Sequence, residues 1–192
     1  MYSKDYSERL RQWNASEQYR QELEFINPLL DIQPKNNILD YGCGIGTAMK
    51  WLAEKHPTAR VYGYDVNKFS GRVVDDFFIR DSYYFRFDRV LFMHSLAHIK
   101  NPQKALNSLI DNFLNPYATV TVMTPNKYWL WLKNGHKHIK TDATVVDHFT
   151  DDTLRKLFEE SGYAVVSQGQ YGAMIGDQAE RLYLVAKKFM EI

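Results

Sequence analysis

Residues 38–47 have the sequence ILDYGCGIGT. Its first half is a short apolar run closed by glycine, which is typical of a buried strand, and the residues from Thr47 to His56 have the character of a helix. Between them Gly42, Gly44 and Gly46 alternate, and residues without side chains let the backbone turn sharply and approach a ligand closely. The stretch therefore predicts a strand, a ligand-binding glycine loop and a helix.

The rest of the chain repeats this alternation. Polar residues 5–30 predict an amphipathic helix broken around Asn14, and the last two predicted strands have too short a connection for a crossover helix, so they should be antiparallel. We expect a single α/β domain over residues 1–192 with a mainly parallel sheet. The predicted strands are 37–42, 60–65, 78–80, 89–93, 117–123, 163–167 and 181–187, and the further helices begin near Ser70, Asn101 and Thr150.

Composition narrows the function classes. The chain has 192 residues with 24 Lys and Arg against 23 Asp and Glu, and this net charge of +1 disfavours a nucleic-acid partner. Cys43 is the single cysteine, which forbids an intrachain disulfide or a Cys-rich zinc site and favours a reducing, cytoplasmic location. The start MYSKDYSERLRQW lacks the apolar core of a signal peptide, and no apolar stretch approaches the ~18 residues of a membrane span.

The glycine loop differs from a dinucleotide fingerprint. Counted from Gly42, the last glycine of the pattern GxGxxG would stand at position 47, where this chain has Thr47. In addition, the acidic residue Asp40 precedes the loop. Asp65 ends the next predicted strand, 19 residues after Gly46. A carboxylate there can accept two hydrogen bonds from a ribose diol, so the spacing fits an adenosine-containing cofactor.

The sequence DYGCGIG consists of an acidic residue, one spacer and GxGxG. This is the first motif of the class I S-adenosylmethionine-dependent methyltransferases, and the chain resembles that family over residues 37–190. The resemblance continues through FDRVLFMHSLAHIKNPQKAL, VTVMTPNKYW and HFTDDTLRKLFEESGY. The TPN turn and the HFT helix are most similar to small-molecule members, such as the ubiquinone-type O-methyltransferases and bacterial sugar or polyketide methyltransferases. The resemblance implies a Rossmann-like, doubly wound sheet of seven strands in the order 3-2-1-4-5-7-6.

The resemblance also implies S-adenosyl-L-methionine as cofactor and supplies its contacts. Region 66–87 is shorter than in the family. Asp81 is the favoured partner of the adenine amine because it follows the apolar run FFI and precedes FD; Asp75 and Asp76 are alternatives, and all three could instead be surface carboxylates. The other expected cofactor-binding residues are Asp40, Gly42, Cys43, Gly44 and Gly46 around the loop, Asp65 and Val66 at the ribose, and Met93 and His94 beside the cofactor.

Acceptor-side residues follow from the same resemblance. His98, with His94 as the alternative, is the expected catalytic base, although a histidine at a strand end can also serve packing alone. Tyr128 and Trp129 are the expected substrate-binding residues, and the alternatives are a short helix packed on the domain, a dimer contact or a membrane contact. The irregularly spaced group His136, His138, Asp142, Asp147 and His148 predicts a substrate-facing lid or a solvated loop within 126–149 rather than a metal site.

The predicted function is in-line transfer of a methyl group to an oxygen or nitrogen of a small molecule, by a monomer or homodimer. The chain lacks the NPPY or DPPY sequence of amine-directed DNA and glutamine methyltransferases at the end of the strand at 89–93. A non-catalytic module that binds S-adenosylmethionine or S-adenosylhomocysteine is the alternative, and a nicotinamide dehydrogenase is opposed by Asp40 and Thr47.

Overall fold

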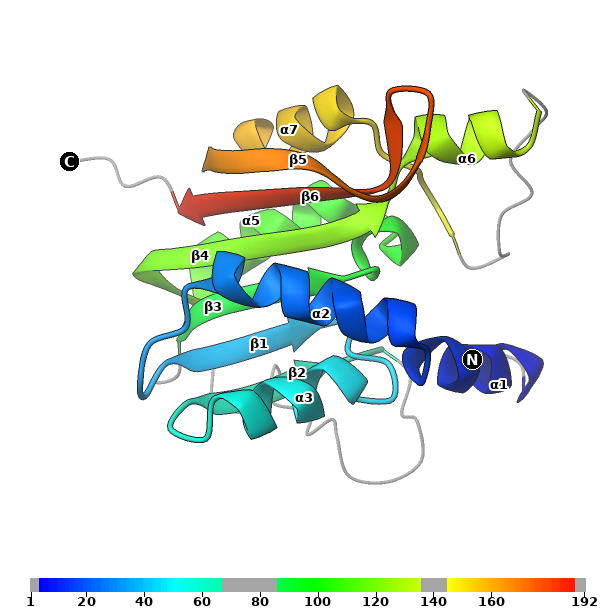
Figure 1. Cartoon of the computed structure of the whole chain (residues 1–192). Coiled ribbons are helices and arrows are strands. Elements are labelled where there is room, and N and C mark those ends of the chain that lie inside the picture. Colours follow the sequence, from blue (N-terminus) through cyan, green and yellow to red (C-terminus); the bar gives the residue numbers. More distant parts are fainter. Residues whose placement is uncertain (1–3, 67–85, 136–144, 189–192) are drawn as a thin grey trace.

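The computed structural model describes residues 4–66, 86–135 and 145–188. Within them six strands form one sheet with helices on both faces (Figure 1). The strands are β1 (Asn37–Tyr41), β2 (Arg60–Tyr64), β3 (Phe87–Met93), β4 (Leu114–Pro125), β5 (Tyr163–Ile175) and β6 (Gln178–Lys188). The helices are α1 (Lys4–Asn14), α2 (Glu17–Leu30), α3 (Thr47–Lys55), the short 3-10 helix η1 (Leu96–His98), α5 (Pro102–Asn112), α6 (Lys127–Lys133) and α7 (Asp151–Glu160).

The sheet has the order β2-β1-β3-β4-β6-β5. The first four strands in this order pair in parallel, and β6 is antiparallel to both β4 and β5. The doubly wound, mainly parallel architecture is confirmed, and the strand order agrees with the predicted one for the six strands described. The predicted helix from Ser70, the predicted strand at 78–80 and Asp81 lie outside the described residues.

The last hairpin differs from the prediction. Two short strands with a Gly-rich connection were expected, whereas β5 and β6 continue until only residues 176 and 177 separate them. Of the glycines that indicated a loop, Gly169 and Gly172 lie inside β5, where register shifts mark two irregularities, and Gly176 lies in the turn. At Gly169 an added Cβ would lie 2.8 Å from the Tyr183 hydroxyl oxygen, so this glycine makes room for a ring of the neighbouring strand.

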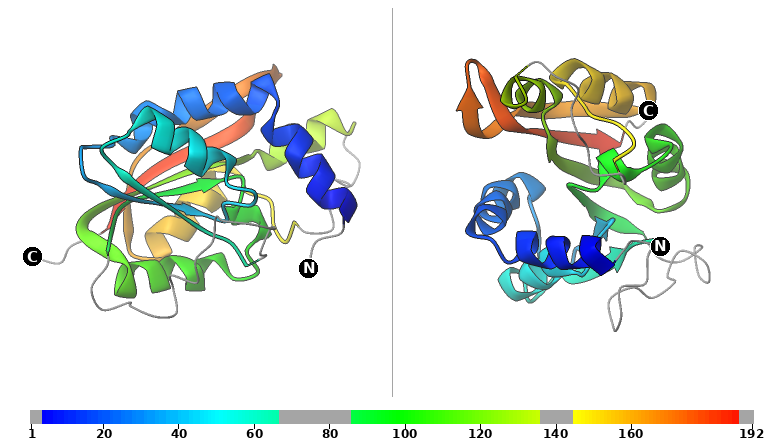
Figure 2. Two further views of the ribbon diagram at one scale, coloured as in Figure 1. Left: turned by 90° about the horizontal axis from the view of Figure 1, so that it is seen from below. Right: turned by 90° about the vertical axis from the view of Figure 1, so that its right-hand side faces the viewer.

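Helices cover the sheet in two layers, with α2 and α3 on one face and α5 and α7 on the other (Figure 2). Along β3, Leu91 and Met93 pack with the α2 and α3 residues, while Val90 and Phe92 pack with the α5 and α7 residues. Because both faces are buried, β3 is apolar at consecutive positions rather than at alternate ones. The carboxyl ends of β1, β3 and β4 reach the edge beside α1, where Tyr41, Met93 and Pro125 line one pocket with residues of α1 (Figure 1).

The long N-terminal helix is broken as predicted. Ser16 begins α2 as its N-cap and accepts a hydrogen bond from the backbone N–H of Tyr19. The aromatic cluster at 127–133 forms a further helix, α6. A short helix was one of the alternatives predicted for this segment.

The carboxyl end of α2 is fixed by Arg89, a buried residue of β3. Its Nε donates to the carbonyl of Leu30 at 2.7 Å, and its Nη2 donates to the carbonyl of Asp31 at 2.7 Å. A guanidinium is a strong partner for the unpaired carbonyls and negative dipole end of a helix. Arg89 therefore holds α2 at a defined position on the sheet.

We expect Arg89→Leu to lower the free energy of unfolding by about 2–3 kcal/mol, since hydrogen bonds to a charged group are lost and buried carbonyls stay unpaired. Urea unfolding followed by circular dichroism measures the change. Arg60→Leu, at an exposed position of β2, is the control. Equal midpoints for the two variants would contradict the anchoring role of Arg89.

Candidate functional site

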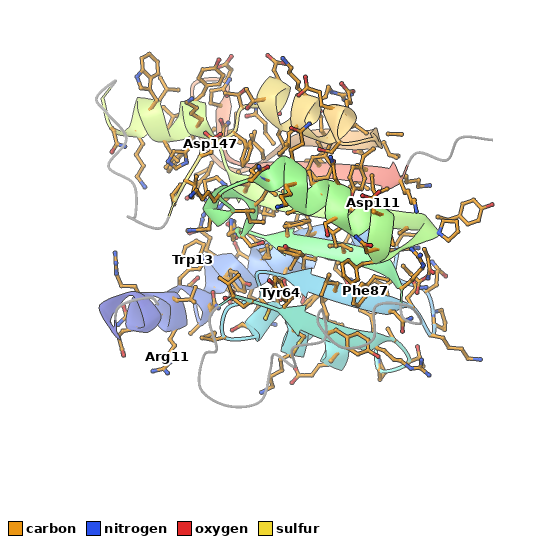
Figure 3. All side chains as sticks on the ribbon, turned by 180° about the vertical axis from the view of Figure 1, so that it is seen from behind. Arg11, Trp13, Tyr64, Phe87, Asp111 and Asp147 are labelled. Atoms are coloured by element: carbon orange, nitrogen blue, oxygen red, sulfur yellow. The ribbon has the colours of Figure 1, made fainter. Side chains whose placement is uncertain are left out.

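A pocket of about 660 Å³ lies at the carboxyl ends of β1, β2 and β3 and is covered by α1. Ligands of open α/β sheets bind at this edge. Figure 3 shows Trp13 of α1 on the side toward the sheet and Arg11 extending away from it, and Trp13 is a lining residue. The lining brings together nine of the predicted site residues: Asp40, Gly42, Cys43, Gly44, Asp65, Val66, Met93, His94 and His98.

The glycine loop is pressed against the end of β3. The backbone N–H groups of Gly42 and Cys43 donate to the carbonyl of Tyr64 at 2.6 and 3.0 Å. Gly42 has a left-handed φ of +79°, and a Cβ there would lie 2.3 Å from the Cβ of Ser95. Ser95 in turn donates a hydrogen bond to the carbonyl of Tyr41. Position 42 thus accepts glycine alone, and the loop backbone faces the pocket.

Asp65 connects the glycine loop to the end of β2. Its Oδ2 accepts a hydrogen bond from the backbone N–H of Gly44 at 2.9 Å. The carboxylate lines the pocket, as a ribose-binding acid should, and also holds the loop. Val66 follows it at the rim and is largely exposed.

Asp40 lies beneath the loop with only 1% of its surface exposed. Neither carboxylate oxygen has a hydrogen-bond partner among the described residues. Burial, followed by the charge of Asp65, raises the pKa of Asp40 to about 7, while the backbone N–H of Met49 in the first turn of α3 opposes the shift. A buried carboxylate without a partner fits a cofactor that brings a cationic or hydrogen-bond-donating group.

Four predicted site residues are not among the described lining residues. Gly46 is the buried N-cap of α3, at a φ of 83°. Tyr128 is 51% exposed on α6, and Trp129 is 5% exposed, with Lys133 Nζ 4.6 Å from its ring centroid. Asp81 lies outside the described residues. Their predicted roles stay predictions.

The structure adds residues that the motifs did not indicate. Trp13, Tyr19 and Arg181 line the pocket, and the buried Glu22 bonds to both Arg181 and His94. A signal for Glu22 was present, because it lies between Tyr19 and Leu23 on the apolar face of a predicted amphipathic helix. Arg181 gave no such signal, since its contact with Glu22 spans 159 positions of sequence.

Cys43 lies in the loop as a buried thiol. Burial, followed by the charges of Asp40 and Asp65, raises its pKa well above the usual range. The thiol is therefore uncharged.

Among the described residues, no group of three or more His, Cys, Asp and Glu is placed so that it could hold a metal ion. None of the described helices is both long and apolar enough to cross a membrane.

A glycine loop after the first strand, a carboxylate at the tip of the second and a pocket at the carboxyl edge define a Rossmann-like protein that binds an adenosine-containing cofactor. A methyltransferase-domain profile matches residues 9–168. The chain belongs to this family and is a class I S-adenosylmethionine-dependent methyltransferase.

Solved structures share the fold. A SAM-dependent methyltransferase from Aquifex aeolicus has a TM-score of 0.68 at 12% identity, with 97% of this chain and 99% of that chain covered. Magnesium protoporphyrin IX methyltransferase from Synechocystis PCC 6803, with bound SAH, has a TM-score of 0.62 at 16% identity, with 88% and 83% covered. A small RNA methyltransferase has a TM-score of 0.71 at 13% identity, with 90% and 25% covered. A search of curated proteins found no match.

Asp40→Asn should stabilise the protein without cofactor. The unfolded carboxyl ionises near pH 4 and the folded one near pH 7, so wild-type stability falls as the pH rises through this window. We expect a gain in unfolding free energy of about 2–4 kcal/mol at pH 8 that vanishes near pH 4. Urea unfolding at both pH values measures it, with the exposed Asp111→Asn as control. A gain independent of pH would contradict this origin.

Gly42→Ala tests the contact with Ser95. Gly176 also has a left-handed φ, of +62°, but an added Cβ there meets nothing within 4 Å. Because both alanines carry the backbone strain and Gly42→Ala adds a steric overlap, it should lose about 1–3 kcal/mol more in unfolding free energy than Gly176→Ala. Binding of S-adenosylhomocysteine should weaken in Gly42→Ala alone. Matching losses in the two variants would show that the overlap is relieved at no cost.

Proposed function

We propose that the protein transfers the methyl group of S-adenosylmethionine to an oxygen or nitrogen atom of a small molecule. The observation that carries the proposal is the pocket, which has the cofactor-type acids Asp40 and Asp65 in its lining and the aromatic side chains Trp13 and Tyr19 from α1 and α2. Its volume, about 660 Å³, falls in the range of small-molecule sites, about 300–1,000 Å³.

The residues of the pocket fit the cofactor. The loop backbone at Gly42 and Gly44 would lie along the methionine part and ribose, Asp65 would accept the ribose hydroxyls, and Asp40 would accept hydrogen bonds at the amino group, directly or through water. Val66 and Met93 would flank the cofactor as predicted. Bound S-adenosylmethionine supplies an electrophilic methyl group on a sulfonium centre, so the chain's own residues need only orient the acceptor, exclude water and take up a proton.

The acceptor would lie against the α1 and α2 side chains. Trp13 and Tyr19 pack edge to face, with ring centroids 6.3 Å apart, and supply an apolar wall for a planar or apolar molecule. A net charge of +1 provides little attraction for a polyanion, so we favour a small molecule over nucleic acid. Solved structures with the same fold include both a plantazolicin methyltransferase and a small RNA methyltransferase.

We propose that Tyr128 and Trp129 contribute to substrate binding indirectly, by way of residues 145–149. The backbone N–H of Lys127 donates to the carbonyl of Phe149 at 2.9 Å, and that of Val146 donates to Ala97 of η1 at 2.8 Å. We propose that α6 steadies residues 145–149, the described end of the predicted lid, against η1, so that Val145 borders the acceptor side. A cytoplasmic monomer or homodimer is consistent with this reaction.

Calorimetric titration with S-adenosylmethionine, S-adenosylhomocysteine and NAD tests the cofactor site. We expect micromolar binding of the first two and none of NAD. Asp65→Ala should weaken binding of both sulfur ligands by about 1–3 kcal/mol, since hydrogen bonds to a charged carboxylate are lost. Asp177→Ala, in the exposed hairpin turn, is the control. Unchanged affinity in Asp65→Ala would remove this residue from the binding site.

A further inference from the structure

A buried carboxylate joins two elements at the acceptor side of the pocket. Glu22 of α2 is 1% exposed. Its Oε2 lies 2.6 Å from Nε2 of His94, and its Oε1 accepts a hydrogen bond from Nε of Arg181 at 2.8 Å. Burial alone would raise the pKa of Glu22, but His94 and Arg181 together lower it, so the carboxylate is ionised. Both carboxylate oxygens of Glu22 therefore have hydrogen-bond partners within the protein.

His94 is held in one orientation by this carboxylate. It follows β3 with a φ of 58°, a left-handed conformation that costs a residue with a side chain about 1–2 kcal/mol. Its backbone N–H still donates to Met123 at 2.8 Å, and its ring lies edge to face with Trp13. With Nε2 bonded to Glu22, Nδ1 has no hydrogen bond among the described residues. The ring lines the pocket, so this nitrogen is the one left for a ligand.

Charged side chains of α2 and β6 gather beside His94. Glu22 and Glu180 are the two carboxylates of the cluster, and Arg181 bonds both, with 2.9 Å between its Nη1 and Oε1 of Glu180. Glu22, Glu180 and Arg181 together carry a charge of −1, and an imidazolium at His94 would bring the sum of the four groups to zero. Tyr19 also faces the ring but stays uncharged, because burial, followed by the charges of Asp40 and Glu22, raises its pKa. The cluster can therefore hold a proton received at Nδ1.

We propose that His94 is the catalytic base, that Glu22 is its positioning residue, and that the acceptor is a hydroxyl compound. This inference rests on the proposed methyl transfer and assigns the base to His94 instead of His98. A neutral amine can attack the methyl group before it loses a proton, whereas a hydroxyl oxygen becomes a good nucleophile only as its proton leaves. A base that is oriented by a buried carboxylate and surrounded by aromatic rings therefore suits a hydroxyl acceptor.

The reaction balances with the groups named. The acceptor oxygen forms a bond to the methyl carbon as its proton passes to Nδ1 of His94. The carbon–sulfur bond breaks, and its electron pair stays on sulfur. The products are a methyl ether, S-adenosylhomocysteine and an imidazolium paired with Glu22. Transfer of the proton to water restores the neutral ring.

Nitrogen-15 NMR of histidine-labelled full-length protein in complex with S-adenosylhomocysteine tests the pair without an acceptor. The His94 signals are assigned by their loss in His94→Gln. In the wild type, neutral His94 should carry its proton on Nε2. Glu22→Gln should lower the His94 pKa by a unit or more, a tenfold loss of proton affinity, and Arg181→Gln should raise it. Glu24→Gln, on the same helix with a partly exposed partner in Lys55, is the matched control and should leave the pKa unchanged.

Arg181→Gln gives an independent arm if Glu22→Gln does not fold. A neutral His94 with its proton on Nδ1, or a His94 pKa that is the same in wild type and in the folded variants, overturns the pairing.

Methyl transfer separates the two histidines. Radiolabelled S-adenosylmethionine is incubated with matched para-substituted phenols and anilines at pH 6–9. We expect transfer to phenols, a loss of kcat of about 10² or more in His94→Gln, and a loss of about tenfold in Glu22→Gln with cofactor affinity within twofold of wild type. Transfer to anilines alone, or a loss of kcat confined to His98→Gln, overturns the assignment. No transfer to either series by a protein that binds the cofactor counts against the proposed small-molecule reaction, and the NMR titration still decides the pairing of Glu22 and His94.

Discussion

The close approach of the glycine loop to the end of β3 is the contact on which the site depends. Gly42 meets Ser95 where no side chain could fit, and this brings the ends of β1 and β3 to one place. Asp40 is buried beneath the loop, Asp65 reaches across from β2 to bond it, and His94 precedes Ser95. The three groups come from three parallel strands, and the loop gives them a common position.

Local features of the sequence determine what could be predicted. The strand, loop and helix around ILDYGCGIGT and the acid at Asp65 follow from short spacings, and both are found at the pocket. The length of β5 could not be predicted, since glycine is a loop signal unless the facing ring, here Tyr183, is known. Trp129 follows a strand end in sequence, but its ring is buried away from the pocket lining. The pairing of Glu22 with Arg181 depends on tertiary packing alone.

Two buried acids in this site differ in their partners. Glu22 is satisfied within the protein, and His94 and Arg181 keep it ionised. Asp40 has no hydrogen-bond partner in the described residues, and its pKa is raised. Glu22 is thus preorganised before any ligand binds, whereas Asp40 is at a disadvantage until a ligand supplies a donor. Without a ligand, Asp40, which we assign to the cofactor, therefore lowers the stability of the fold, whereas Glu22, which orients the base, does not.

The break between α1 and α2 separates a helix that covers the pocket from one that is fixed to the sheet. Arg89 and Glu22 bind α2 to the sheet, while α1 contacts the loop through Asn14, whose Nδ2 donates to Thr47 at 3.2 Å. Trp13, on α1, also packs against His94 and lies under the guanidinium of Arg181. Displacement of α1 would therefore open the pocket and admit water to the imidazole in the same movement. Product departure and loss of the captured proton would then occur together, and the base would be reset once in each turnover.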